Sequence, residues 1–199
     1  MTGMKTWVLA SHNRGKIKEI GDQLARFGVK LQSAAQFSLP EPEETEATFA
    51  GNALLKARAA SSATGLPALA DDSGLCVNAL NGQPGIHSAR WAGESRDFNR
   101  AMQRIESALT ASGGNDRSAA FVCVLALAVP GEADRVYEGR IEGEVVWPPR
   151  GDAGFGYDPA FRPEGDHRVF AEMSSAEKAA LSHRGRALSR LIEAEFGND

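Results

Sequence analysis

The apolar residues of this 199-residue chain follow two spacings, one typical of strands and one typical of helices. Short continuous or alternating apolar runs predict strands at residues 6–10, 29–33, 66–70, 75–80, 119–129 and 135–147. Apolar residues at helical spacing predict helices at residues 17–27, 48–63 and 95–112, and again in the last part of the chain. Strands that alternate with helices predict a mixed α/β fold.

Two of these elements allow sharper expectations. In the first helix, Ile17, Ile20, Leu24 and Phe27 should face inward. The run at residues 119–129 is so continuously apolar that it predicts a central strand covered on both faces.

Composition restricts the classes of partner. The net charge of -4 argues against general binding of nucleic acid or acidic membrane, because such binding requires a broad positive field. Cys76 and Cys123 fit no metal-ligand spacing and no disulfide framework, and no apolar stretch reaches membrane-spanning length. We therefore expect one cytoplasmic domain over residues 1–199, in which a phosphate-bearing partner meets a local basic site.

A basic loop follows the first strand and leads directly into the first helix. Its residues are Ser11, His12, Asn13, Arg14, Gly15 and Lys16. The helix directs its free N–H groups and the positive end of its dipole at this loop, which favours binding of an anion such as a polyphosphate. The alternative is a solvated basic helix start. The loop matches neither the P-loop nor the dinucleotide-binding glycine pattern.

Adjacent carboxylates follow the apolar run at residues 66–70. Asp71, Asp72 and Ser73 precede Gly74, so the run resembles a strand end that delivers charge, although a simple turn has the same composition. Two like charges need a nearby cation or hydrogen-bond donors, and Mg²⁺ prefers such hard oxygen ligands. One of the acids at residues 41–46 could supply another ligand, or these acids could serve only the helix dipole.

The C-terminal part holds a second set of polar and aromatic residues. A glycine-rich loop at residues 151–159 carries Phe155, Gly156, Tyr157 and Asp158. Its aromatic rings could stack on a nucleobase or could plug the core under the loop. Further along, a capping box at residues 174–177 opens a short helix, which residues 182–185 interrupt. This break presents Lys178, His183 and Arg184, each of which alone is more often an ordinary surface residue.

Taken together, six motifs in register resemble the inosine triphosphate pyrophosphatase family, also called Ham1-like. They are Ser11-His12-Asn13-Arg14-Gly15-Lys16, Thr48-Phe49-Ala50-Gly51-Asn52-Ala53 with Lys56-Ala57, Ala70-Asp71-Asp72-Ser73-Gly74-Leu75, Pro84-Gly85-Ile86-His87-Ser88-Ala89-Arg90, Phe155-Gly156-Tyr157-Asp158 and Ser182-His183-Arg184-Gly185. The resemblance implies an elongated mixed β-sheet flanked by helices in two lobes with a central cleft. It also implies a Mg²⁺-dependent homodimer that cleaves ITP, dITP and XTP to the monophosphate and pyrophosphate.

The same resemblance implies roles for individual residues. The loop from Ser11 to Lys16 holds the triphosphate, and Lys16 places positive charge where negative charge shifts in the transition state. Asp72 is the catalytic and metal carboxylate, with Asp71 supporting it, Ser73 touching the substrate and Glu44 as the second metal ligand. Phe155 stacks on the base, whose polar edge is surrounded by Asp158, Lys178, His183 and Arg184.

The chain departs from the family pattern at three places. His12 stands where glycine or asparagine is common and could touch phosphate or fill the loop. Glu46 stands where the family often has glycine, which leaves Glu43 and Glu44 both open as the ligand. Gly51 stands where the family often has glutamate, at an expected cost of about 1 kcal/mol in helix stability. Two other classes stay open: a nucleotide sensor without turnover, and a phosphatase of the distantly similar Maf-like group acting on pyrimidine nucleotides.

Overall fold

The computed structural model describes residues 5–11 and 13–197. Within them the chain forms two compact units. Unit 1 comprises Met1–Asp72, Val124–Glu138 and Ala187–Asp199, and unit 2 comprises Ser73–Cys123 and Gly139–Arg186. None of the helices in the described part of the chain is long and apolar enough to span a membrane.

The strands form a six-stranded sheet with the order β2-β1-β3-β4-β5-β6. Their bounds are Lys5–Leu9 (β1), Val29–Ser33 (β2), Ala68–Val77 (β3), Ser118–Ala128 (β4), Arg135–Val145 (β5) and Phe161–Pro163 (β6). β1 pairs in parallel with β2 and β3, whereas β5 and β6 are antiparallel. The sheet is therefore mixed, as the family resemblance implies.

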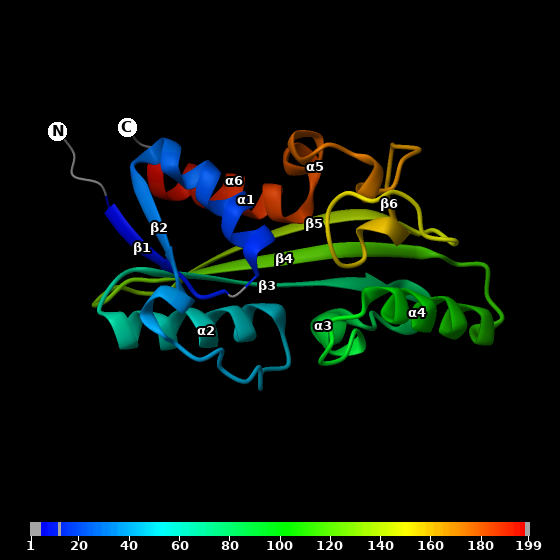
Figure 1. Ribbon diagram of the computed structural model, residues 1–199, viewed down its shortest axis with the longest axis horizontal. Helices are drawn as coiled ribbons and strands as arrows, with labels where there is room; N and C mark the ends of the chain where they lie inside the picture. Colours follow the sequence, from blue (N-terminus) through cyan, green and yellow to red (C-terminus); the bar gives the residue numbers. More distant parts are fainter. Residues whose placement is uncertain (1–4, 12, 198–199) are drawn as a thin grey trace. The chain divides into compact units, whose positions relative to one another are not determined.

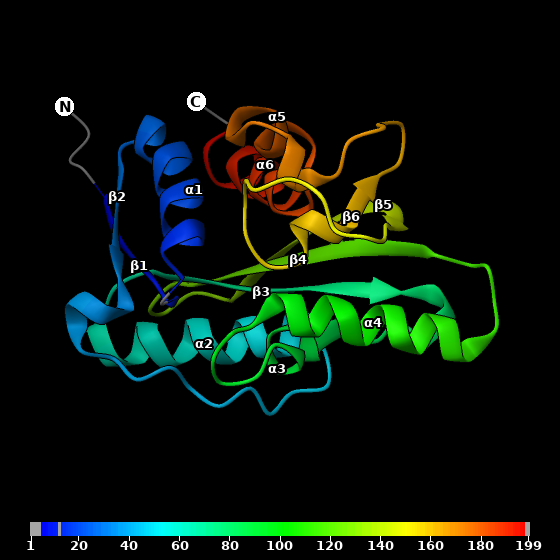
Figure 2. The same cartoon turned by 45° about the vertical axis from the view of Figure 1, so that its right-hand side comes forward.

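Two helices cover the part of the sheet that belongs to unit 1. In both views of the ribbon, α1 (Arg14–Leu24) and α2 (Phe49–Thr64) lie on opposite sides of β1 (Figures 1 and 2). Val8, Ala60 and Ala68 form a small buried cluster between β1, β3 and α2. This packing fixes the C-terminal end of β1, and with it the start of α1.

The first helix begins earlier and ends earlier than its apolar spacing predicts. Asn13 caps α1 by accepting hydrogen bonds from the backbone N–H groups of Gly15 and Lys16. A short 3-10 helix, Ala25–Phe27, follows α1, and the changed spacing turns Phe27 outward. The expectation that Phe27 faces inward is wrong, since the residue is 40% exposed and its ring stacks on that of Phe196.

The segment with the adjacent carboxylates is one strand rather than two. β3 continues through Asp71 and Asp72, so these residues lie inside a strand and neither at a strand end nor in a turn. The expected strands at residues 66–70 and 75–80 are joined in this one strand, and an isolated bridge links Cys76 to Pro84. The strand tolerates adjacent buried carboxylates because lysines from two helices approach them.

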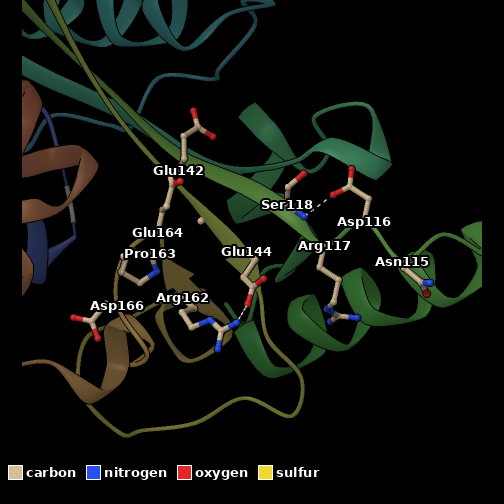
Figure 3. A pocket seen from close by; sticks show the side chains of 12 residues that line it. Asn115, Asp116, Arg117, Ser118, Glu142, Glu144, Arg162, Pro163, Glu164 and Asp166 are labelled. Atoms are coloured by element: carbon tan, nitrogen blue, oxygen red, sulfur yellow. Dashed lines mark hydrogen bonds and ion pairs between the residues drawn. The ribbon is translucent and has the colours of Figure 1, made fainter.

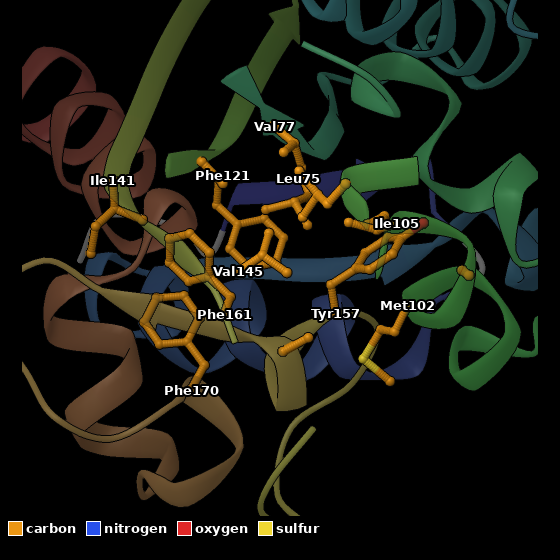
Figure 4. Close-up of a cluster of buried hydrophobic side chains, with 14 of the residues drawn as sticks. Leu75, Val77, Met102, Ile105, Phe121, Ile141, Val145, Tyr157, Phe161 and Phe170 are labelled. Atoms are coloured by element: carbon orange, nitrogen blue, oxygen red, sulfur yellow. The ribbon is translucent and has the colours of Figure 1, made fainter. Parts of the chain in front are cut away.

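Unit 2 is built on a larger apolar core. Its helices are α3 (Ser88–Trp91), α4 (Phe98–Ser112) and α5 (Ser175–Leu181). Figure 4 shows rings of Phe121, Phe161 and Phe170 packed together, with Leu75 and Ile105 nearby in the same cluster. Phe121 contacts Phe161 edge to face with ring centroids 4.6 Å apart.

The C-terminal helices match the predicted capping box and break. Ser174 and Glu177 form the capping box that opens α5. α5 ends at Leu181, and α6 (His183–Phe196) begins after the single residue Ser182. The break therefore lies at one residue, and it places His183 and Arg184 in the first turn of α6.

Candidate functional site

The basic loop of unit 1 forms the N-terminal cap of α1. Ser11 is buried, and its Oγ accepts a hydrogen bond of 3.2 Å from the Asn13 N–H. Asn13 in turn accepts from Gly15 and Lys16, so the loop is held by its own side chains. His12 lies outside the described residues, and Arg14 is the first residue of the helix.

Lys16 reaches from the first turn of α1 to the middle of β3. Its Nζ lies 2.7 Å from Oδ2 of Asp71, whose side chain is 1% exposed. The first turn of α1 contains no acidic residue, so the cation and the helix dipole add their positive potential at one place. The pair joins the predicted phosphate loop to the predicted carboxylates.

Asp72 is buried among groups that shift its pKa in opposite directions. Its Oδ2 accepts a hydrogen bond of 3.1 Å from Nδ2 of Asn52, and its Oδ1 lies 3.9 Å from Nζ of Lys56. Burial raises the pKa of Asp72 to about 6, helped by the charge of Glu44 and opposed by Lys56, Asn52 and Lys16. A carboxylate with such a pKa can accept a proton near neutral pH.

Lys56 brings a second carboxylate to the same place. Its Nζ donates to Oε1 of Glu44 at 2.6 Å, and its side chain is buried. Burial by itself lowers the pKa of Lys56, but Asp71, Asp72 and Glu44 together raise it. Glu44 is half-buried in this contact, whereas Glu43 is exposed.

The described residues contain no group of three or more His, Cys, Asp or Glu side chains that could hold a metal ion. Glu44 and Asp72 nevertheless converge on one cation, the Lys56 ammonium. Two carboxylates are the usual protein share of a Mg²⁺ site whose remaining ligands are phosphate and water. The donor set therefore fits a hard divalent cation bound together with a phosphate.

In unit 2, Asp158 and Lys178 form a buried ion pair. Lys178 Nζ donates to Oδ2 of Asp158 at 2.6 Å, and the same oxygen accepts from the N–H of Phe155 at 2.8 Å. Burial raises the pKa of Asp158, and these two donors oppose the shift. A side chain at Gly154 would collide with the Asp158 carboxylate, so this glycine allows the loop to close on the pair.

Two cations lie over the ring of Phe155. Lys178 Nζ is 4.5 Å from the ring centroid and the Arg184 guanidinium carbon is 5.4 Å from it. His183 stacks on Phe121 with centroids 4.6 Å apart. The structure thus brings together four of the predicted base-binding residues, Phe155, Asp158, Lys178 and Arg184, and places His183 beside them in sequence with its ring on the core.

The remaining predicted residues of unit 2 are placed differently. The Tyr157 side chain belongs to the apolar core, where its ring meets Phe98 edge to face and its hydroxyl donates to the Ser88 carbonyl at 2.8 Å (Figure 4). Gly156 is half-buried beside Phe98, and Ser73 is half-buried in β3. The aromatic loop therefore provides both a plug for the core, Tyr157, and a ring outside it, Phe155.

Comparison with known proteins assigns the chain to a family. The model of the Ham1 family matches residues 7–194. The chain belongs to the Ham1 family. The family resemblance of the six motifs is thereby confirmed.

Relatives of this Ham1-family chain carry the name dITP/XTP pyrophosphatase. One from Gluconobacter oxydans is 56% identical over 186 residues, which are 93% of this chain and 88% of the relative. Another, from Rhodospirillum centenum, is 56% identical over 189 residues, or 94% and 93% of the two chains. The solved structure of a HAM1 protein from Coxiella burnetii is 44% identical, has a TM-score of 0.90 and covers 96% of this chain and 98% of its own. This likeness confirms the predicted α/β class.

Two residues that contact Asp72 in unit 1 were given no role from the sequence. Asn52 and Lys56 both contact Asp72, and both are buried on α2. The available signal was their spacing of four residues on an otherwise small and apolar helix. That spacing identifies a shared helix face but does not identify what the face contacts.

A separate pocket of about 660 Å³ in unit 2 contains none of the predicted site residues. Figure 3 shows its acidic side chains near the start of β4 and the end of β5, with Arg162 contacting Glu144 and the Ser118 N–H donating to Asp116. Asp166 at its rim pairs with Arg168. Within the described residues, three of the pocket's acidic side chains, those of Asp116, Glu144 and Asp166, therefore already have partners in the protein.

Proposed function

We propose that this protein hydrolyses ITP, dITP and XTP to the monophosphate and pyrophosphate and so removes non-standard purine nucleotides from the nucleotide pool. The observation that carries this proposal is the cluster of Lys16, Glu44, Lys56, Asp71 and Asp72 in unit 1. It joins a cationic helix start to two carboxylates able to hold a divalent cation. The printed names of the relatives support the choice of substrate.

In this proposal the loop from Ser11 to Lys16 binds the triphosphate through the first N–H groups of α1 and the Lys16 ammonium. The ion pair with Asp71 holds the Lys16 ammonium in place before the substrate binds. The ammonium then stabilises negative charge that shifts during cleavage between the α and β phosphates.

Glu44 and Asp72 are the proposed ligands of Mg²⁺. The contact of Glu44 with Lys56 supports Glu44 over the exposed Glu43 as the second ligand. When bound, the metal supplies charge neutralisation for the phosphate oxygens and lowers the pKa of a water molecule. Asp72, whose carboxylate lies beside this site, would accept the proton of the attacking water.

The unit 2 cluster is the proposed base-recognition site. Phe155 stacks on the purine, and Arg184 and Lys178, with His183 and Asp158, surround its polar edge. A 6-oxo group accepts a hydrogen bond where adenine carries a donor, so a cationic donor such as Arg184 pairs with hypoxanthine and xanthine and mismatches adenine. Ser73 and the backbone of Gly156 and Tyr157 are proposed further contacts.

We further propose a homodimer in which each chain is one functional domain over residues 1–199. These statements, the cytoplasmic location and the lack of a nucleic-acid partner come from the family resemblance and from the charge of -4, and they stay predictions. Analytical ultracentrifugation of the purified chain measures the oligomeric state directly.

The function is tested by incubating purified protein and Mg²⁺ with the deoxy triphosphates of inosine, xanthosine, guanosine, adenosine and uridine. Chromatography of the products distinguishes pyrophosphate from orthophosphate. We expect monophosphate and pyrophosphate, with strong preference for the inosine and xanthosine substrates, and loss of activity in Asp72→Asn. Orthophosphate release or a pyrimidine preference would contradict the proposal, as would binding without turnover, the behaviour of a sensor.

A further inference from the structure

Gly51 lies in the first turn of α2, in close contact with the acidic segment that precedes the helix. A Cβ atom at Gly51 would lie 2.7 Å from Cβ and 3.0 Å from Cγ of Glu46, and 3.1 Å from Oγ1 of Thr48. Cβ atoms essentially never approach another carbon this closely, and the Glu46 Cβ is fixed to the backbone. The stem of Glu46 therefore occupies the space that a side chain at residue 51 would need.

The same turn of α2 also holds the backbone of the acidic segment. Oδ1 of Asn52 accepts a hydrogen bond of 3.0 Å from the N–H of Glu46, while its Nδ2 donates to Asp72 at 3.1 Å. One turn later, Lys56 donates to Glu44 at 2.6 Å. Asn52 is 1% exposed, so its two hydrogen bonds are protected from competition by water. Glu44 and Asp72 are thus tied to one helix face through neighbouring contacts.

The beginning of the same segment is packed less closely. In both ribbon views the chain before α2 runs along this helix (Figures 1 and 2). A cavity of about 180 Å³ lies beside Leu39–Pro42, and its lining on the side of α2 consists of Lys56, Ala59, Ala60 and Ala63. Such a gap forfeits part of the packing energy of this stretch. Leu39 packs on the cluster of Val8, Ala60 and Ala68, and the last residues of the segment are held where Glu46 meets Gly51 and Asn52.

We propose that Gly51 is a positioning residue: by lacking a side chain it lets Glu46 dock on the first turn of α2, and this docking holds Glu44 beside Lys56 and Asp72. The inference rests on the proposed role of Glu44 and Asp72 as ligands of a divalent cation. In this chain the stem of Glu46 occupies the space that a side chain at residue 51 would need.

The test is the binding of Mn²⁺ alone, measured by electron paramagnetic resonance on the full chain without nucleotide, together with hydrogen exchange of the Glu46 amide without metal. In Gly51→Ala we expect Mn²⁺ affinity to fall by about 10-fold, the loss typical of disturbing the groups that orient metal ligands. The Glu46 amide should exchange faster, because its hydrogen bond to Asn52 is strained.

Two double variants distinguish a collision between the Cβ atoms of residues 46 and 51 from a general destabilisation of α2. Glu46→Gly removes the Cβ and should restore Mn²⁺ affinity and amide protection in the Gly51→Ala background. Glu46→Ala keeps the colliding Cβ and should restore neither. Should Gly51→Ala fail to fold, the same rule applies to folding: rescue by Glu46→Gly alone supports the proposal, and no rescue overturns it.

Gly21→Ala is the matched control, since Gly21 is a helical glycine of the same unit whose added Cβ would meet only Leu31 Cδ2, at 3.9 Å. It should leave both measurements unchanged. Gly51→Ala with wild-type Mn²⁺ affinity and wild-type amide protection would overturn the inference, because Gly51 would then be only a weak point of the helix. A wild-type chain that binds no Mn²⁺ would instead refute the proposed metal site, while amide exchange would still decide the role of Gly51.

Discussion

The two charged clusters of the molecule differ in the sign of their net charge. In unit 1, Lys16 and Lys56 face the three carboxylates of Glu44, Asp71 and Asp72. In unit 2, the single carboxylate of Asp158 is matched by Lys178, and Arg184 lies over the same aromatic ring as that lysine. The first cluster is short of positive charge and the second is not.

This difference in charge indicates a catalytic role for the unit 1 cluster and a recognition role for the unit 2 cluster. A surplus of buried negative charge is tolerated where a cation binds, and burial, with a smaller contribution from the charge of Glu44, raises the pKa of Asp72 to about 6. A closed ion pair beside an aromatic face changes little during a reaction and suits recognition of a fixed shape. Substitutions in unit 1 should therefore lower kcat, whereas substitutions in unit 2 should raise KM or change the choice of base.

The largest expected effect is that of Lys16→Met. Loss of one charge that stabilises the transition state should lower kcat by about 100-fold to 1000-fold, with a smaller change in KM. Steady-state kinetics with dITP measure both constants. Lys18→Met is the matched control, because Lys18 lies two residues along the same helix, is exposed and pairs only with the exposed Asp22 in the contacts observed for it.

The ion pair of Lys16 requires a second control for stability. Lys16→Met removes the 2.7 Å contact of buried Asp71, which by itself should destabilise unit 1. Lys16→Met combined with Asp71→Asn should recover the melting temperature without recovering kcat. Recovery of kcat together with stability would show that Lys16 is structural and would remove the contrast between the clusters.

The next effect is on stability and depends on pH. Because the pKa of Asp72 is raised to about 6 in the folded state, the folded chain binds this proton more tightly than the unfolded chain. In metal-free protein, the free energy of unfolding should fall as pH rises from about 4 to about 6, by at most about 3 kcal/mol from this group. Urea unfolding in the presence of a chelator, at several pH values, measures this contribution.

Asp72→Asn isolates the contribution of that residue. The variant should lose this part of the pH dependence and, in chelator at pH 7, be more stable than the wild type. Added Mg²⁺ should stabilise the wild type but not the variant, because binding to the folded state alone shifts the unfolding equilibrium. Equal dependence of the free energy of unfolding on pH in the two proteins would mean that the charged form of Asp72 does not destabilise the folded chain.

Much of the fold could be predicted from apolar spacing. The strand at Val29–Ser33 has the expected bounds, and Ser118–Ala128 is buried along its length as its unbroken apolar run predicts. Apolar spacing does not decide whether the strands expected at residues 66–70 and 75–80 are continuous through Asp71 and Asp72. The countercharges that allow one continuous strand come from Lys16 on α1 and Lys56 on α2, and apolar spacing does not reveal these contacts.

The candidate site could be predicted less completely. Its charged motifs stand out, but a local pattern does not distinguish Phe155, outside the core, from Tyr157, whose ring lies inside it. Nor does the presence of Gly51 reveal that Glu46 occupies the adjacent space. Both facts depend on contacts between segments, which amino-acid periodicity does not contain.

The smallest expected effect tests the second cluster. Phe155→Leu should raise the KM for dITP by about 10-fold, since stacking of a base on an aromatic ring contributes about 1 to 3 kcal/mol. Its kcat should stay near the wild-type value, because Phe155 contacts Lys178 and Arg184 and none of the carboxylates of unit 1 is among its observed contacts. Trp147→Leu, at an exposed aromatic residue of the same unit, is the control. Every purine presents an aromatic face, so the preference for dITP over dATP should persist in Phe155→Leu; a loss of that preference would assign base choice to the ring instead of to the cations above it.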